Sequence, residues 1–336
     1  MTYYPYLRAR QYELLALREL LMAGKLPVQV TPIIEPVKDT PQLRQTMKIF
    51  RERENGALGV VLNPDVGDLT ADTDLDSRFD IYGNSQTLPL IGESGRIVPA
   101  ILLNNDAMTV ANRVEQTDAT LMEESGIVFV SENDRGRIRN LKEFKFHAIA
   151  SSDSMQLRRD LKRNDISAKR ILFSDPFIKR ENNAAYDDDD CRDEFFSDDH
   201  LWYKDEGQYE GFGDYSIVGD NYDERGGMPK AVAVHIVYFD EHWNLRIHHF
   251  VSYASDDVHE TPAKFIQAVE KLSAWHDERD GLSSEHMTIG MRTLINHAET
   301  GTYPGLPTIK KLSIMHHLEL MGWFFSERPD LQCDAA

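Results

Sequence analysis

The stretch VTPIIEPVKDTPQL (residues 30–43) joins the end of an apolar, β-branched run to the beginning of a helix-like segment. Glu35 stands where the apolar run stops, and the following Pro36 favours an extended conformation for it. Nearly continuous apolar character is typical of parallel strands that are covered on both faces. The stretch therefore predicts one unit of a repeated strand–helix pattern, with a charged residue at the carboxyl end of the strand.

The same pattern recurs through the first half of the chain, which predicts a parallel sheet. With six strands visible, a closed (β/α)8 TIM-barrel-like fold of the α/β class is favoured over an open sheet. The predicted strands are Val28–Glu35, Ala57–Asn63, Ile97–Leu103, Gly126–Ser131, Lys145–Ala150 and Lys169–Asp175. The helical patterns between them are Gln42–Glu54, Ala107–Leu121, Arg135–Leu141 and Met155–Arg163.

An acidic insertion at residues 178–213 interrupts this regularity. From residue 187 to residue 224 there are fifteen Asp and Glu residues against two basic ones. Aromatic side chains lie within the insertion, whereas disordered acidic tracts usually lack them. We therefore expect an ordered lid or partner-binding loop, with a solvated acidic loop as the alternative. The candidate partner-binding residues are Phe195, Phe196, Trp202 and Tyr203.

The segments after the insertion depart from strand–helix repetition. FGDYSIVGD (212–220) predicts a strand, and AVAVHIVYF (231–239) predicts the first strand of a β-hairpin with its turn near residues 240–244. We expect the hairpin to form the irregular last repeats of the barrel. Three helices are then predicted, Pro262–Glu278, Ser284–Ala298 and Ile309–Ser326. The expected organisation is one barrel domain over 1–260, with the helices of 261–336 packed on it.

Composition narrows the classes of function. The 336 residues carry a net charge of −19, so direct nucleic-acid binding through the acidic face is not expected. No apolar run is long enough to cross a membrane, and the N-terminal residues lack the layout of a signal peptide. The two cysteines, Cys191 and Cys333, show neither disulfide nor metal-ligand spacing. We expect a cytoplasmic protein without a membrane segment.

Functional residues of a (β/α)8 barrel collect at the carboxyl ends of its strands. Glu35, Glu132 and Asp175 would there be adequate ligands for Mg²⁺ or Mn²⁺. Lys38 could bind a phosphate, which gives Glu35, Lys38 and Asp175 as the candidate catalytic set. The alternative for Glu35 and Lys38 is an exposed ion pair worth about 0–1 kcal/mol. His235, in the middle of an alternating strand, is either a hydrogen-bonded core histidine or a catalytic one.

Several segments resemble the "beta family" of bacterial and phage proteins, and in particular its subgroup named after a myxobacterial locus. The resemblance covers residues 3–253 and is carried by YYPYLRARQYELLALREL, VTPIIEPVK, FGDYSIVGD and AVAVHIVYF. It implies a barrel-like fold and a setting in mobile elements and phage-conflict gene clusters, beside a partner gene. The matching positions are Tyr4, Pro5, Leu7, Glu13, Glu35, Lys38, Asp175, Asp214, Tyr215, Gly219 and Asp220.

Two functional hypotheses follow, and a plain scaffold is a third. In the first, the chain is a component of an antiviral-defence or toxin-neutralising module, and its acidic insertion binds a basic protein such as a nuclease encoded nearby. In the second, it is a divalent-metal-dependent phosphodiesterase with its site at the mouth of the barrel. Whether the carboxylates at the strand ends converge distinguishes these two hypotheses.

Overall fold

The computed structural model describes residues 2–53, 56–80, 96–207, 209–223, 229–279, 287–328 and 331. The chain divides into two compact units, which are described separately. The first contains Met1–Ser174 and Asp199–Tyr215, and the second contains Asp175–Asp198 and Ser216–Pro329. The division differs from the boundary expected at residue 260. It also divides the acidic insertion between the two units.

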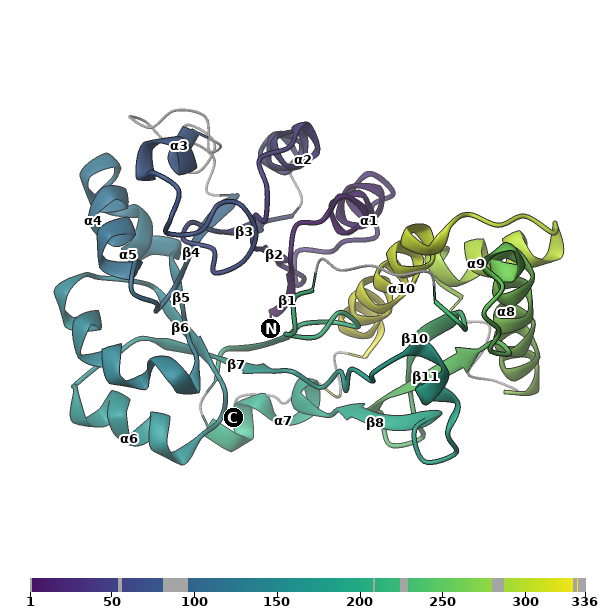
Figure 1. Ribbon diagram of the computed structural model, residues 1–336. Coiled ribbons are helices and arrows are strands. Elements are labelled where there is room, and N and C mark those ends of the chain that lie inside the picture. Colours follow the sequence, from purple (N-terminus) through teal and green to yellow (C-terminus); the bar gives the residue numbers. More distant parts are fainter. Residues whose placement is uncertain are drawn as a thin grey trace. The chain divides into compact units, whose positions relative to one another are not determined.

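The first unit is a closed barrel of eight parallel strands (Figure 1), which confirms the TIM-barrel-like fold. Around the barrel each strand pairs with the next in the chain, except that β7 pairs with β9, which closes on β1. The strands are β1 (Tyr3–Leu7), β2 (Ile33–Ile34), β3 (Leu58–Val61), β4 (Ile97–Leu102), β5 (Ile127–Val130), β6 (Ala148–Ser151), β7 (Lys169–Ser174) and β9 (Gly211–Asp214).

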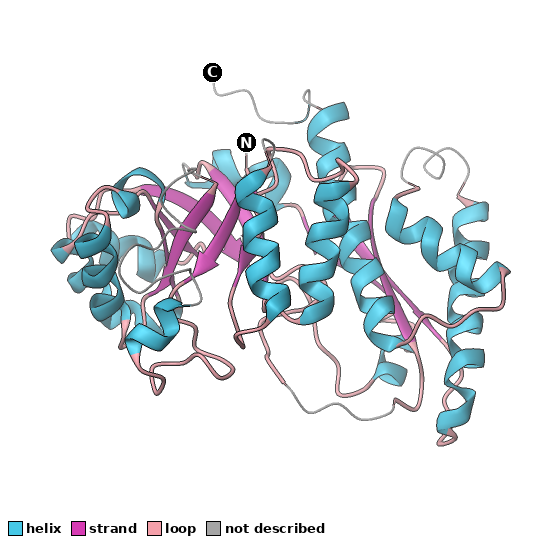
Figure 2. Cartoon of the chain, turned by 90° about the horizontal axis from the view of Figure 1, so that it is seen from above, coloured by secondary structure: helices cyan, strands magenta, loops and turns pink. Residues whose placement is uncertain are grey.

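Helices flank the barrel strands (Figure 2), and their sequences explain where they begin. In α2, Thr40 accepts a hydrogen bond from the backbone of Leu43 (3.2 Å), and Pro41 occupies the first turn, where its missing N–H costs nothing. The helical elements of this unit are α1 (Gln11–Met22), α2 (Pro41–Glu52), α3 (Leu75–Asp80), α4 (Ala107–Thr117), α5 (Leu121–Ser125), the 3₁₀-helix η1 (Glu132–Glu143), α6 (Met155–Arg163) and α7 (Asp199–Gly207).

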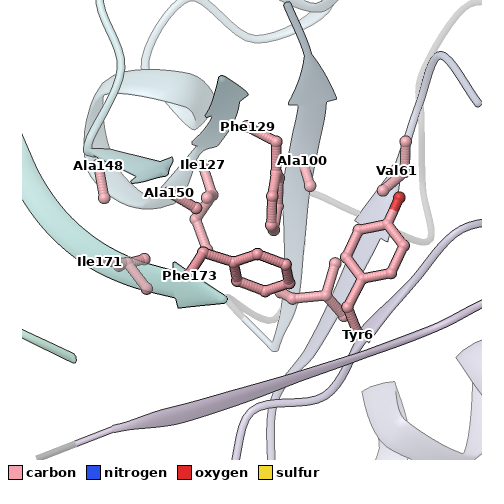
Figure 3. Close-up of a cluster of buried hydrophobic side chains, with 10 residues drawn as sticks. Tyr6, Val61, Ala100, Ile127, Phe129, Ala148, Ala150, Ile171 and Phe173 are labelled. Atoms are coloured by element: carbon pink, nitrogen blue, oxygen red, sulfur yellow. The ribbon is translucent and has the colours of Figure 1, made fainter. Parts of the chain in front are cut away.

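Alternate residues of the strands fill the barrel interior. The rings of Tyr6, Phe129 and Phe173 point toward one another (Figure 3), with centroids 5.2–6.0 Å apart in edge-to-face arrangements. Tyr215 adds a fourth ring, 5.1 Å from both Tyr6 and Phe173. The interior is therefore a packed aromatic core rather than an open channel, as side-chain layers in this fold usually are.

Strand β9 closes the barrel, although the sequence predicted a longer strand over 212–220. It ends at Asp214, because Ser216 has a φ of 51°, a left-handed conformation that cannot continue a strand. Asp214, one of the candidate site residues, accepts a hydrogen bond from the hydroxyl of Tyr3 (2.7 Å). Both side chains are buried. Asp214 therefore fixes β9 to β1 and has a structural partner.

Gly213 allows this closure, and replacing it with Ala should lower the free energy of unfolding by about 1–3 kcal/mol. A Cβ atom there would lie 2.4 Å from the carbonyl oxygen of Tyr4 on β1 and 2.9 Å from the ring of Phe173. Gly136→Ala is the matched control, because a Cβ atom at that position meets nothing within 4 Å. Urea denaturation of both variants tests this, and equal stabilities would contradict it.

The second unit is built on an antiparallel sheet in the order β10 (Ala233–Phe239), β11 (Leu245–Val251) and β8 (Asp193–Ser197). The predicted hairpin is confirmed, with Phe239 opposite Leu245. However, it pairs with β8 and is not a repeat of the barrel, which corrects the expectation above. The remaining elements are η2 (Asn183–Asp187), η3 (Val258–Glu260), α8 (Thr261–Glu278), α9 (Ile289–Glu299) and α10 (Leu306–Glu327). Among the described residues, no helix combines the length and apolar character needed to cross a bilayer.

Candidate functional site

Glu35 lies at the carboxyl end of the barrel strands and is completely buried. Its backbone N–H donates to the carbonyl oxygen of Leu7 (2.8 Å), which extends the pairing of β1 and β2 up to this position. Its Oε2 accepts hydrogen bonds from Arg8 Nη1 and from the hydroxyl of Tyr6 (2.8 Å). Its Oε1 accepts from the backbone N–H of Asp65 (2.8 Å). These donors allow a charged carboxylate to be buried here.

Two tyrosine rings contact Arg8 beside Glu35. Its guanidinium carbon lies 5.2 Å from the ring centroid of Tyr6 and 5.3 Å from that of Tyr215, within cation–π range. Burial opposes its charge, but the Glu35 carboxylate and the two tyrosines raise the pKa of Arg8 above its ordinary value. Burial, and then the Glu35 carboxylate, raise the pKa of Tyr6 well above 10. Arg8 therefore keeps its charge beside Glu35, and Tyr6 is a neutral donor.

Lys38 does not contact Glu35 and lies on the surface instead. Its Nζ is 3.3 Å from Asp68 Oδ2, and the two side chains are 68% and 63% exposed. Such a pair contributes about 0–1 kcal/mol. The cation beside Glu35 is Arg8, which was not among the residues predicted for the site. The run YYPYL, with Arg8 directly after it, was the available signal for a first strand that ends in a charge.

Two asparagines continue the polar rim of the barrel. The side-chain amide of Asn63 donates to Leu102 O and to Asn104 Oδ1, both at 2.8 Å, and its Oδ1 accepts from the backbone of Leu102 (2.8 Å). Asn104 in turn donates to Asp65 Oδ1 (2.7 Å). The two side-chain amides form hydrogen bonds with each other and with the backbone at the end of β4. They therefore stabilise the strand ends next to Glu35.

The other predicted carboxylates have local partners. Glu132, at the start of η1, accepts a hydrogen bond from Ser152 Oγ (3.1 Å) and lies 3.7 Å from Arg135. Asp175 belongs to the second unit, where its Oδ2 accepts from the backbone N–H of Asp220 (2.9 Å). The structure thus brings the candidates Asp175 and Asp220 together as a turn contact between two exposed residues.

The predicted metal site has no counterpart in these contacts. Within the described ranges, no group of three or more His, Cys, Asp or Glu side chains could hold a metal ion. Glu35, Glu132 and Asp175 therefore do not form such a group. A cation at Glu35 would also have to displace the guanidinium of Arg8 from Oε2. The phosphodiesterase hypothesis required such a group, so these contacts give it no support.

The four candidate partner-binding aromatics separate into two classes. Phe196 is 3% exposed and packs against His317, and Tyr203 is fully buried against Phe212. Because these two side chains belong to the core, they cannot contact a protein partner. Phe195 on β8 and Trp202 on α7 are 52% and 50% exposed. Because adjacent strand residues point to opposite faces, Phe195 and Phe196 could not both have been exposed on one face.

His235 is partly buried in a cluster with His249 and Tyr186, which are buried, in the second unit. Its Nδ1 is 2.6 Å from Nδ1 of His249, whose Nε2 is 3.3 Å from Glu194 Oε1. Both imidazoles contact the ring of Tyr186. Burial lowers the pKa of His235 to about 4 and that of His249 to about 2. These contacts are those of a neutral, hydrogen-bonded core histidine, the first of the two alternatives for His235.

This pair predicts acid sensitivity. In the unfolded chain histidines protonate near pH 6.5, whereas in the folded chain these two remain neutral. The unfolded state therefore binds more protons, and the free energy of unfolding should fall by about 2 kcal/mol per such histidine between pH 7 and 5. Urea denaturation at the two pH values measures this. His235→Phe should reduce the fall, and His242→Gln, at an exposed position, should not. Equal falls in all three proteins would refute it.

The arrangement at the barrel mouth has the properties of a structural polar network. The carboxylate of Glu35 is paired with Arg8, and the amides of Asn63 and Asn104 form a hydrogen bond with each other. Comparison with known proteins adds no assignment, because no protein-family model, curated protein or solved structure matches the chain.

Proposed function

We propose that the protein is the binding component of a bacterial or phage conflict module, for defence or toxin neutralisation. It binds a basic protein partner through the acidic face around β8, with Phe195 as the aromatic anchor. The observation that carries this proposal is the exposure of Phe195, 52%, on a strand that follows a run of exposed carboxylates in the chain. The resemblance to the beta family supplies the setting, with a partner encoded nearby.

The surroundings of Phe195 suit such an interface. Among the described strands β8 pairs only with β11, so it is an edge strand of its sheet. The exposed carboxylates of Asp188, Asp189 and Asp190 precede it in the chain. Aromatic side chains dominate the binding energy of many interfaces, and charges of one sign increase the rate of encounter with an oppositely charged partner. A nucleic acid is the wrong partner for this surface, because its phosphates would be repelled.

Trp202 is a second candidate anchor, in the first unit. It is half exposed on α7, while its neighbour Tyr203 is buried. The phosphodiesterase hypothesis has less support, because none of the contacts of Glu35, Glu132 or Asp175 favours a shared metal ion. We therefore retain it only as the alternative.

The test is calorimetric titration of the full chain with the purified basic protein encoded beside its gene. Wild type should bind, and affinity should fall as salt is added. Phe195→Ala should weaken binding at least about tenfold, which is about 1.4 kcal/mol. Tyr253→Ala is the matched control, because Tyr253 is an exposed aromatic residue of the same unit, at 40%. Equal affinities of wild type and Phe195→Ala would refute the assignment of the surface.

A further inference from the structure

A cavity of about 330 Å³ lies in the second unit, beside β11 and α8. Its volume is at the lower end of the range of small-molecule pockets, about 300–1,000 Å³. Three of the side chains that line it can carry a positive charge, Arg192, His248 and Lys271. Phe250 and Trp275 supply aromatic walls. Asp187 lines the same cavity.

His248 is held in position by a carboxylate behind it. Its Nδ1 lies 2.8 Å from Asp193 Oδ2, and Asp193 also accepts from the hydroxyl of Tyr238 (2.7 Å) and from Arg246 Nε (2.7 Å). Burial opposes the charge of Asp193, but these hydrogen bonds lower its pKa to about 2. A carboxylate acceptor fixes the proton of His248 on Nδ1. Nε2 makes no hydrogen bond to any described residue, so it is available to a ligand.

The imidazole is also fixed in its plane. It stacks on Phe250 with centroids 4.4 Å apart and contacts Trp275 at 5.4 Å. Arg192 and Lys271, which extend from different elements, both approach the carboxylate of Asp187, at 3.3 Å and 3.9 Å. Asp187 thus lies between two cations, while Arg192 also contacts Asp189 (3.1 Å) and Lys271 donates to the carbonyl oxygen of Val251.

We propose that this cavity binds the phosphate group of a small molecule, whose ring lies against Trp275. Arg192 and Lys271 donate to phosphate oxygens, and Nε2 of His248, held in position through Nδ1 by Asp193, forms a hydrogen bond to the same phosphate. The phosphate competes with Asp187 for the two cations. Because the walls are aromatic, a phosphate attached to a ring, as in a nucleotide, binds more tightly than phosphate alone. The cavity adjoins β8, since Asp193 lies two residues before Phe195, but this proposal does not rest on the proposed function.

The experiment is NMR of the full chain labelled with ¹⁵N-histidine, titrated with inorganic phosphate, with AMP and with uncharged adenosine. Phosphate and AMP should move the His248 Nε2 resonance saturably, and adenosine should not. His248→Asn should reduce the affinity for AMP, measured by calorimetry, at least tenfold. Asp187→Asn should increase it, because the competing carboxylate is removed. His242→Asn, at an exposed position, should leave it unchanged.

Three results would overturn the proposal. They are no saturable shift of Nε2 in the wild type, unchanged affinity in His248→Asn, or weaker AMP binding in Asp187→Asn. Equal binding of adenosine and AMP would also overturn it, because it would indicate recognition of the ring alone. If His248→Asn does not fold, the increase expected for Asp187→Asn decides the question. None of these results depends on the protein partner, so the two proposals fail separately.

Discussion

Arg8→Met should lower the free energy of unfolding by about 3–5 kcal/mol, the cost of leaving one member of a buried ion pair without its partner. Glu35 is completely buried, and its Oε2 would keep only the hydroxyl of Tyr6 as a donor. Methionine approximates the length of the arginine stem, so packing between Tyr6 and Tyr215 is largely kept and the loss reports the charge. Urea denaturation, with equal slopes for both proteins, measures it.

Two further variants separate the ion pair from general damage. In Arg8→Met/Glu35→Leu both charges are absent, and most of the lost stability should return. Lys38→Met, which removes the other cation near the strand end, should cost no more than about 1 kcal/mol. A loss below 1 kcal/mol for Arg8→Met would show that the pair is not structurally important.

The barrel could be predicted because its strands carry a strong local signal. The residues of β3 and β5 are apolar on both faces, since one face meets the interior and the other meets helices. β2 shows the limit of this signal. Its apolar run covers Val28–Glu35, yet only Ile33–Ile34 is paired as a strand, because Pro32 and the turn before it interrupt the ladder.

The end of the barrel could not be predicted for a different reason. β8, α7 and β9 lie within one acidic segment, but their partners are distant in sequence. β8 pairs with β11, which comes about fifty residues later. β9 pairs with β1, which lies at the N-terminus. GFGD has two glycines and one charge, so its apolar character is weak. It forms a strand because it pairs with β7 and β1 where the barrel closes.

The candidate site illustrates the same distinction. Glu35 was recognisable because its position at the end of an apolar run is a local property. Its partner was not, because Lys38 is nearer in sequence, whereas Arg8 is 27 residues away. Register between β1 and β2 decides which cation reaches the carboxylate, and register is not encoded in the spacing of charges along one segment.

Phe173→Ala is the second large effect that we expect, also a loss of about 3–5 kcal/mol. The ring of Phe173 contacts those of Tyr6, Phe129 and Tyr215 at 5.1–6.0 Å, so its removal opens a cavity inside the barrel. The two tyrosines are those that enclose Arg8, so the cavity should also weaken the ion pair with Glu35. The losses of unfolding free energy in Phe173→Ala and Arg8→Met should therefore not add up in the double variant.

The matched control is Phe195→Ala, which removes the same side chain from a half-exposed position. It should change the free energy of unfolding by less than about 0.5 kcal/mol. Urea denaturation of Phe173→Ala, Arg8→Met and the double variant measures the coupling. A double variant whose loss equals the sum of the two single losses would show that the aromatic core and the ion pair are independent. A smaller loss would show that the four rings inside the barrel are what positions the buried charges at its mouth.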